Sequence, residues 1–328
     1  SATITGSLPI TGAEYFIGGQ GVSGAGTAMT ASDGVFDSTT EAVEAAISSV
    51  DLAAMLTGDH TFYVHGTDGT WGAFNFAVLH LDNVGPATSA ISLVPNPNNG
   101  STAVSLSATG NDSASGNSNI SEAEFFVDAT GADGTGTTMN VNITAPIASL
   151  TGTIPAGLAE GEHTIYVHSM DAFGWWGDYA TATLVIDQTG PTTSNVVANP
   201  NPNNGSTPYS PTNIAVRVDA ILSDASSTIF KIEGFINTVG ADGSGFPLTP
   251  RDGLFNEMDE EAYVYIPLTT IAQLGAGTHQ IYVHAQDASG NWGATDFVDF
   301  VIETGIPVVS NLAVDPVSTD GTVAVALT

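Results

Sequence analysis

The chain has 328 residues, enough for two to three domains of ordinary size. It carries 34 acidic and 3 basic residues, a formal net charge of −31, although only 11% of its residues are charged. This balance excludes nucleic acid and anionic membranes as partners and favours divalent cations as counter-charge. The chain has no cysteine, so it has no disulfide, and it contains no apolar run of about 18 residues that predicts insertion into a membrane.

One motif occurs three times, in the segments 58–72, 161–177 and 277–293. Each copy has two histidines five residues apart, then an aspartate, then a Trp-Gly pair. Copies begin 103 and 116 residues apart, so the repeating unit is a small domain rather than a solenoid turn. Ile165 and Val167 alternate with polar or aromatic residues, which predicts a half-buried strand.

Turns rich in Gly, Pro and Asn separate about seven short strands in each unit, which predicts an all-β protein made of tandem immunoglobulin-like antiparallel β-sandwiches arranged end to end. The segment 40–47 has helical propensity, but its counterpart in the third unit is a clear strand pattern, so we predict a strand. Gly-Pro hinges mark the boundaries. The predicted divisions are 1–84 (an incomplete domain lacking its first two strands), 85–189, 190–304, and 305–328 (the first two strands of a further domain).

The two ends of the chain carry complementary parts of one unit. One interpretation is that the chain is a single period of a longer polypeptide. The other is that each subunit donates its last strands to the incomplete sandwich of the next, which would generate a filament of copies joined head to tail. The donated assembly strand would present Val323, Val325 and Leu327.

The unit resembles the bacterial Ig-like repeats of prokaryotic cell-surface and extracellular proteins. The resemblance lies in Glu124-Phe125-Phe126-Val127, in the segment 158–165, and in an Asp-Ala-x-Gly-Asn pattern that the segment 287–291 matches best. It covers nearly the whole chain, and it implies the sandwich fold and a location on the cell surface of a prokaryote. It implies nothing about a ligand.

Calcium is the predicted cofactor. Each complete unit has an acid after its second strand, a glutamate in its third strand and an aspartate after its histidine-rich strand, and these positions can converge at one pole of a sandwich. Acids with so few bases to pair with either bind cations or repel one another. Two hinge aspartates are further candidates, for calcium between domains. The predicted metal ligands are Asp112, Glu124, Asp171, Asp224, Glu233, Asp287, Asp82 and Asp187.

Other polar and aromatic residues have weaker signals. We expect His163 to face the core and to be structural, whereas His65, His168 and His284 lie on the opposite face of their strands, exposed or packed laterally. Trp175 has no counterpart in the other units and is a possible sugar contact. Sequons for N-glycosylation occur at Asn99, Asn111, Asn119, Asn142 and Asn204.

The sequence has no nucleophile motif, no Gly-rich phosphate loop beside a lysine and no metalloprotease helix, so we expect no enzyme. The leading hypothesis is a structural subunit of an extracellular filament, stiffened by calcium. The alternative is an adhesin stalk, or the carbohydrate-binding repeats of a larger surface protein, with surface glycans as partners.

Overall fold

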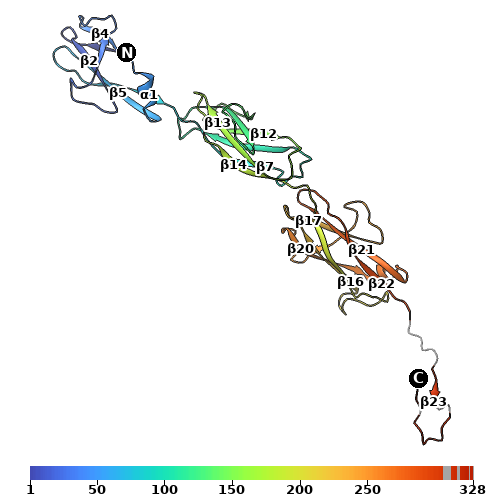
Figure 1. Ribbon diagram of the computed structural model, residues 1–328. Helices are drawn as coiled ribbons and strands as arrows, with labels where there is room; N and C mark the ends of the chain where they lie inside the picture. Colours follow the sequence, from blue (N-terminus) through green and yellow to red (C-terminus); the bar gives the residue numbers. More distant parts are fainter. Residues whose placement is uncertain (306–311, 316–317, 325, 328) are drawn as a thin grey trace. The chain divides into compact units, whose positions relative to one another are not determined.

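The computed structural model describes residues 1–305, 312–315, 318–324 and 326–327. Its contacts divide into two compact units, Ser1–Asn96 with Gly100–Ile186, and Pro97–Asn99 with Asp187–Thr328. Every pairing between its named strands is antiparallel, which confirms the prediction of an all-β chain (Figure 1). The strands form three successive sets, which we call the first, second and third modules.

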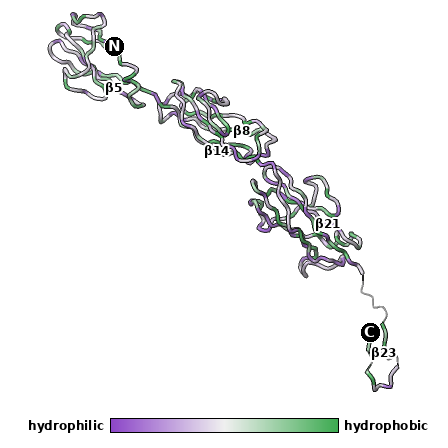
Figure 2. Tube along the Cα trace, viewed as in Figure 1, coloured by the Kyte–Doolittle hydropathy of each residue, from purple (hydrophilic) through white to green (hydrophobic). Residues whose placement is uncertain are grey.

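The second module contains two sheets of four strands, ordered β10-β9-β13-β14 and β11-β12-β8-β7. Side chains that alternate along these strands meet in one core, where Leu106, Leu150, Ile165 and Leu184 are fully buried. Figure 2 shows hydrophobic residues interspersed with hydrophilic ones along the strands, as half-buried strands require. The strands are β7 (Ala87–Val94), β8 (Val104–Asn111), β9 (Ile120–Val127), β10 (Thr137–Thr138), β11 (Asn140–Val141), β12 (Ile147–Ile154), β13 (Gly161–Asp171) and β14 (Ala180–Ile186).

The third module repeats this arrangement, with sheets ordered β18-β17-β21-β22 and β15-β16-β20-β19 around its own core. Its strands pair in the same register, so that His284 lies opposite Glu233 as His168 lies opposite Glu124. One short helix, α2 (Leu268–Ile271), directly follows β20 (Asp259–Pro267). The strands are β15 (Thr192–Asn199), β16 (Ala215–Ser223), β17 (Ile229–Ile236), β18 (Phe246–Pro247), β19 (Thr249–Pro250), β20 (Asp259–Pro267), β21 (Gly277–Asp287) and β22 (Asp296–Ile302).

The first module is less complete. Its six strands form one sheet ordered β1-β4-β3-β2-β5-β6 around a small core, with one short helix, α1 (Ser49–Ala53). Nothing among its described residues corresponds to β7 or β15. The strands are β1 (Ala2–Thr5), β2 (Gly12–Ile17), β3 (Thr27–Ala31), β4 (Thr40–Glu44), β5 (Gly58–Thr67) and β6 (Asn75–Leu81). The segment predicted as a strand at 40–47 is therefore a strand over its first five residues.

The register of the first module places β1 where the end of the second strand lies in the other modules. Thr5 pairs with Thr40 in β4, as the ends of β8 and β16 pair with β12 and β20. The next residue, Gly6, donates its N–H to the carbonyl of Thr39, as Asp112 and Asp224 donate to the carbonyls at the equivalent positions. The first module thus already contains the end of a strand that the sequence interpretation assigned wholly to 305–328.

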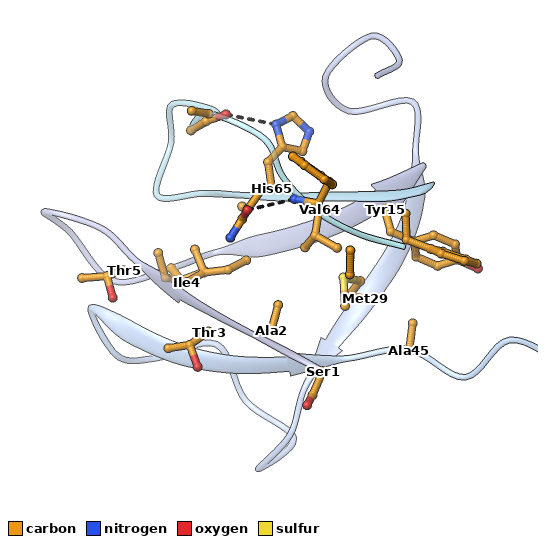
Figure 3. Close-up of a pocket in the computed structure, with 18 of the residues that line it drawn as sticks. Ser1, Ala2, Thr3, Ile4, Thr5, Tyr15, Met29, Ala45, Val64 and His65 are labelled. Carbon is orange, nitrogen blue, oxygen red and sulfur yellow. Dashed lines mark hydrogen bonds between the residues drawn. The ribbon is translucent and has the colours of Figure 1, made fainter. Parts of the chain in front are cut away.

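An open groove of about 670 Å³ lies on the first module where β7 and β15 cover the others. Figure 3 shows Ala2, Ile4, Met29 and Val64 pointing into this space. Beside it on β6, Leu79 is 37% exposed, whereas its counterparts Leu184 and Phe300 are fully buried. The first module therefore leaves apolar side chains exposed that the other two modules bury.

The Gly-Pro hinges contact the Trp-Gly pairs of the modules that they precede. A Cβ placed on Gly177 would lie 1.7 Å from the carbonyl oxygen of Pro86, and a Cβ on Gly293 would lie 1.7 Å from that of Pro191. Backbone meets backbone at these points, so only glycine fits. The equivalent Gly72 of the first module has nothing closer than the carbonyl of Gly66 at 3.5 Å.

Near the C-terminus, β23 (Val314–Asp315) pairs with β24 (Ala326–Leu327), and Val314 lies opposite Leu327. Val323, one of the predicted assembly residues, is 60% exposed. The backbone of Leu327 belongs to β24, and Val325 lies outside the described residues.

Candidate metal centres

Three aspartates meet at one end of the second module, and we call them the first cluster: Asp82, Asp112 and Asp171. Asp82 lies in the connection between β6 and β7, Asp112 directly after β8, and Asp171 at the end of β13. One carboxylate oxygen from each lies within 4.8 Å of the others. Asp112 and Asp171 are fully buried and Asp82 is 9% exposed. The three basic residues of the chain, Arg217, Lys231 and Arg251, all belong to the third module.

Hydrogen bonds satisfy only part of the first cluster. Asp112 accepts from the hydroxyls of Ser115 and Ser118 and from the N–H of Ser118. Asp171 accepts two backbone N–H groups on Oδ1, but its Oδ2 and the Oδ2 of Asp82 are buried without a hydrogen-bond partner. An unsatisfied buried polar group costs about 1–3 kcal/mol, and more when charged. The cluster therefore has two oxygen atoms that lack a positive partner.

Burial raises the pKa of Asp82, and the negative charges of Asp112 and Asp171 raise it further. A hydrogen bond from Ser118 lowers this pKa but does not cancel the rise. Gly116 makes the approach possible, because a Cβ on Gly116 would lie 2.0 Å from the carboxyl group of Asp82. A shared Ca²⁺ would offset two of the three negative charges and contact both oxygens that lack a partner, and clustered carboxylates are ligands that Ca²⁺ prefers.

The third module has an equivalent second cluster, made of Asp187, Asp224 and Asp287. All three side chains are buried. Burial raises the pKa of Asp287, and the negative charge of Asp187 raises it further, whereas hydrogen bonds from Asn291 lower it. The hydroxyl of Ser227 donates to Asp187 Oδ2 at 2.6 Å. Asn291 donates its side-chain amide to Asp287 Oδ2 at 2.8 Å. The second cluster is therefore more fully hydrogen-bonded than the first.

The two predicted glutamate ligands lie elsewhere. Glu124 accepts the N–H groups of Gly134 and Gly136, and His168 Nε2 lies 2.7 Å from it. Glu233 binds Gly243, Gly245 and His284 in the same way, and these bonds lower its pKa although burial opposes them. These carboxylates anchor the glycine-rich turn of each module. Glu233, His284 and the exposed Asp242 also approach within 4.8 Å, but hydrogen bonds already join the first two.

The histidines follow one of the two predicted alternatives, since those on the outer face are packed laterally and not exposed. His168, expected on an exposed or laterally packed face, is 1% exposed, and His65 and His284 are each 3% exposed. The turn after β13 folds Trp176 back over the ring of His168, 4.4 Å between centroids, and thereby covers the outer face of the strand. His163 is a structural histidine as expected: its ring is 12% exposed, and its two nitrogens lie 2.8 Å from Asp128 Oδ2 and 2.9 Å from the carbonyl oxygen of Ala159.

The first module has no such cluster, and all of its residues are described. Gly6 occupies the position of Asp112. Asp68, the counterpart of Asp171, accepts the N–H and hydroxyl of Ser7 and the N–H of Leu8, and these bonds lower its pKa. Its carboxylate is therefore satisfied without a cation.

The sequence singled out six of the aspartates but grouped them differently. The hinge residues Asp82 and Asp187 were assigned to separate interdomain sites, whereas the structure places each beside the two acids of the following module. The sequence did not single out Asn291, whose side chain lies beside Asp287, because an uncharged residue leaves no signal in charge or composition.

The remaining candidates lie on the surface. Trp175 is 48% exposed and its neighbour Phe173 is 71% exposed. Among the sequons, Asn119, Asn142 and Asn204 are exposed, and Asn99 and Asn111 are half-buried. Glycosylation and sugar contact stay predictions. Within the described residues, no helix has the length and apolar character needed to cross a membrane.

No protein-family model matches the chain, and no curated protein matches it either. Among solved structures, the chain is similar to the fibronectin(III)-like modules of Clostridium thermocellum CbhA, at 16% identity over 68% of this chain and 99% of that one, with a TM-score of 0.31. It is also similar to the FN1-FN3 domains of chicken CNTN1, at 12% identity over 90% and 89% of the two chains, with a TM-score of 0.31. A Ca²⁺-stabilized adhesin with which an Antarctic bacterium binds ice matches at 15% identity over 90% and 65%, with a TM-score of 0.32.

These similarities are too distant to carry information about ligands. The fold rests on the sheets themselves: the chain is a tandem series of antiparallel, immunoglobulin-like β-sandwich modules, two of which hold a buried cluster of three aspartates.

Proposed function

We propose that this protein is a structural subunit of an extracellular filament on the surface of a prokaryote, in which copies join head to tail. In this proposal the groove of the first module binds the segment 305–328 of a second copy. The observation that carries it is the exposure of Leu79 at the groove, 37% against none for Leu184 and Phe300. A strand from outside would restore the burial that β7 and β15 provide in the other modules.

The sequence of 305–328 supports this occupant. It begins with a Gly-x-Pro hinge at Gly305, the third of its kind, and continues with the alternating apolar residues of the first two strands of a unit. The hinges before the second and third modules contact Gly177 and Gly293, while Gly72 at the groove has no such contact. In this proposal the hinge of a second copy contacts Gly72 as the other two hinges contact Gly177 and Gly293. A head-to-tail contact of this kind does not close, so it builds a fibre.

The test is assembly of the full chain, measured by light scattering and negative-stain microscopy. Leu79→Asp places a charge on β6 beside the groove and is expected to abolish fibres. The matched control is Val78→Asp, on the outer face of the same strand, where the third module already has Asp299. Fibres in the wild type and in Val78→Asp, but not in Leu79→Asp, support the proposal. A monomeric wild type, or fibres that persist in Leu79→Asp, contradicts the second copy as occupant.

We further propose that Ca²⁺ binds the aspartate clusters and stiffens the fibre. Asp82 and Asp187 belong to the connecting segments, so a cation shared with the acids of the following module holds each connection in place. Calcium is expected to protect the connection at 82–86 from proteolysis, and EDTA to expose it. Equal cleavage in both conditions would contradict this role.

A second candidate function is contact with surface glycans, favoured by the exposed aromatic pair Phe173 and Trp175 on one loop of the second module. Exposed rings of this kind stack on sugar faces. Binding on a glycan array that Trp175→Ala removes would support this function, and binding that survives the substitution, or none at all, would refute it.

A further inference from the structure

The two aspartate clusters occupy the same position in their modules but differ at one residue. In both, the first aspartate of the turn accepts the backbone N–H of the residue four positions on: Trp175 donates to Asp171 Oδ1 at 2.9 Å, and Asn291 donates to Asp287 Oδ1 at 2.8 Å. The backbone geometry is thus shared. The side chains at this position are an indole in the second module and an amide in the third.

The amide of Asn291 lies among oxygen atoms. Its Nδ2 is 2.8 Å from Asp287 Oδ2, 2.8 Å from the carbonyl oxygen of Asp187 and 3.4 Å from that of Thr189. All three neighbours accept hydrogen bonds, so the amino group rather than the amide oxygen must face them. A group of positive polarity inside a set of carboxylate and carbonyl oxygens has the surroundings of a bound cation.

The first cluster has no equivalent donor. Trp175 contributes its backbone N–H but directs no polar side-chain atom to Asp171, whose Oδ2 has no hydrogen-bond partner. Asp82 Oδ2, contributed by the connecting segment, is unsatisfied as well. Both atoms are buried, so bulk solvent does not reach them. The residue that differs between the modules therefore accounts for an oxygen atom that is satisfied in one cluster and bare in the other.

From this comparison we infer that the clusters are unequal calcium sites: Asp82, Asp112 and Asp171 bind Ca²⁺ strongly, whereas the amide of Asn291 takes the place of a cation beside Asp187 and Asp287. This inference rests on the proposed calcium binding and assigns it mainly to one site. Calcium entering the second cluster must first displace the Asn291 hydrogen bonds, whereas calcium entering the first cluster displaces none from Asp171 Oδ2. The connection before the second module is then fixed by calcium, and the connection before the third by the protein itself.

Calorimetric titration of the EDTA-treated full chain with CaCl₂ tests the inference. The expected result is one strong class of site and one at least about tenfold weaker, the size of about one hydrogen bond to a charged group. Asp112→Asn should remove the strong class and Asp224→Asn the weak one, which assigns each class to its cluster.

Substitution of the residue that differs between the clusters, Trp175 or Asn291, gives a more specific test. Trp175→Asn should weaken the strong class at least about tenfold, and Asn291→Ala should strengthen the weak class. Two classes of equal affinity overturn the inference while leaving calcium binding intact, as does Asn291→Ala weakening the second site, since Asn291 would then be a ligand. No calcium binding to the wild type overturns the inference and the proposed calcium role together.

Discussion

The buried pair of His168 and Glu124 provides a prediction whose size follows from the structure. Glu124 is 3% exposed, accepts two backbone N–H groups and lies 2.7 Å from His168 Nε2. His168→Ala would leave this carboxylate in the interior without its ring partner. Leaving a buried carboxylate without its hydrogen-bond partner costs about 3–5 kcal/mol. We expect the second module to lose that much stability while the other modules keep theirs.

Hydrogen exchange of the full chain, read peptide by peptide, measures this loss within one module. Because each 1.4 kcal/mol is a factor of ten, amides of β9 and β13 should exchange about 100 to 3,000 times faster in His168→Ala. The matched control is His163→Ala, whose partner Asp128 has a side chain 54% exposed to solvent. The ring of His163 is itself 12% exposed, but its removal leaves a solvated carboxylate and not a buried one, so exchange should change less than in His168→Ala.

A further substitution separates the lost charge partner from the cavity that alanine leaves. Adding Glu124→Gln to His168→Ala should restore part of the protection, because a neutral amide needs no counter-charge. If His168→Ala affects exchange no more than His163→Ala, the pair does not hold the module together. If Glu124→Gln worsens the loss, the uncompensated carboxylate is not its cause.

Three shorter predictions concern the clusters and the hinges. Gly116→Ala should weaken calcium binding at the first cluster in a titration, because the new Cβ would lie 2.0 Å from the carboxyl group of Asp82 and must displace it. Without calcium, the temperature of thermal unfolding of the second module should rise as the pH falls through the raised pKa of Asp82, down to about pH 3.9. The reason is that the folded state binds the proton of Asp82 more tightly than the unfolded state does. Bound calcium should remove this gain in stability. Gly177→Ala should cost at least about 2 kcal/mol in thermal unfolding because its Cβ would overlap the carbonyl of Pro86, whereas Gly72→Ala should leave the isolated chain stable and impair only fibre assembly.

The repeats made the strands predictable. Comparison between units identified 40–47 as a strand against its helical propensity, and the structure contains β4 there, because packing in a sheet outweighs a preference of a few tenths of a kcal/mol per residue. The same comparison could not place residues where one unit departs from the others. Gly6 is an example, since only the register with β4 shows that it stands where Asp112 stands.

The candidate site was predictable in its chemistry and less so in its geometry. Charge identified the six aspartates, but it also suggested Glu124 and Glu233, whose strands direct them to a glycine-rich turn instead. Alternation along β13 put His168 on the correct outer face, but it could not show that a later turn folds Trp176 over that face and buries the ring. A period-two pattern describes a single strand and does not show which later segment of the chain packs over it.

The contact of Gly177 with the carbonyl of Pro86, and its repetition at Gly293 and Pro191, has a consequence for how such a chain grows in evolution. The second and third modules each contain both the hinge by which the chain enters and the glycine that contacts it. A duplicated stretch of gene that includes the hinge therefore brings its own entry geometry, whatever module precedes it. Arrays can lengthen, shorten or change order without new complementary mutations, and the aspartate of each hinge travels with the acids it joins.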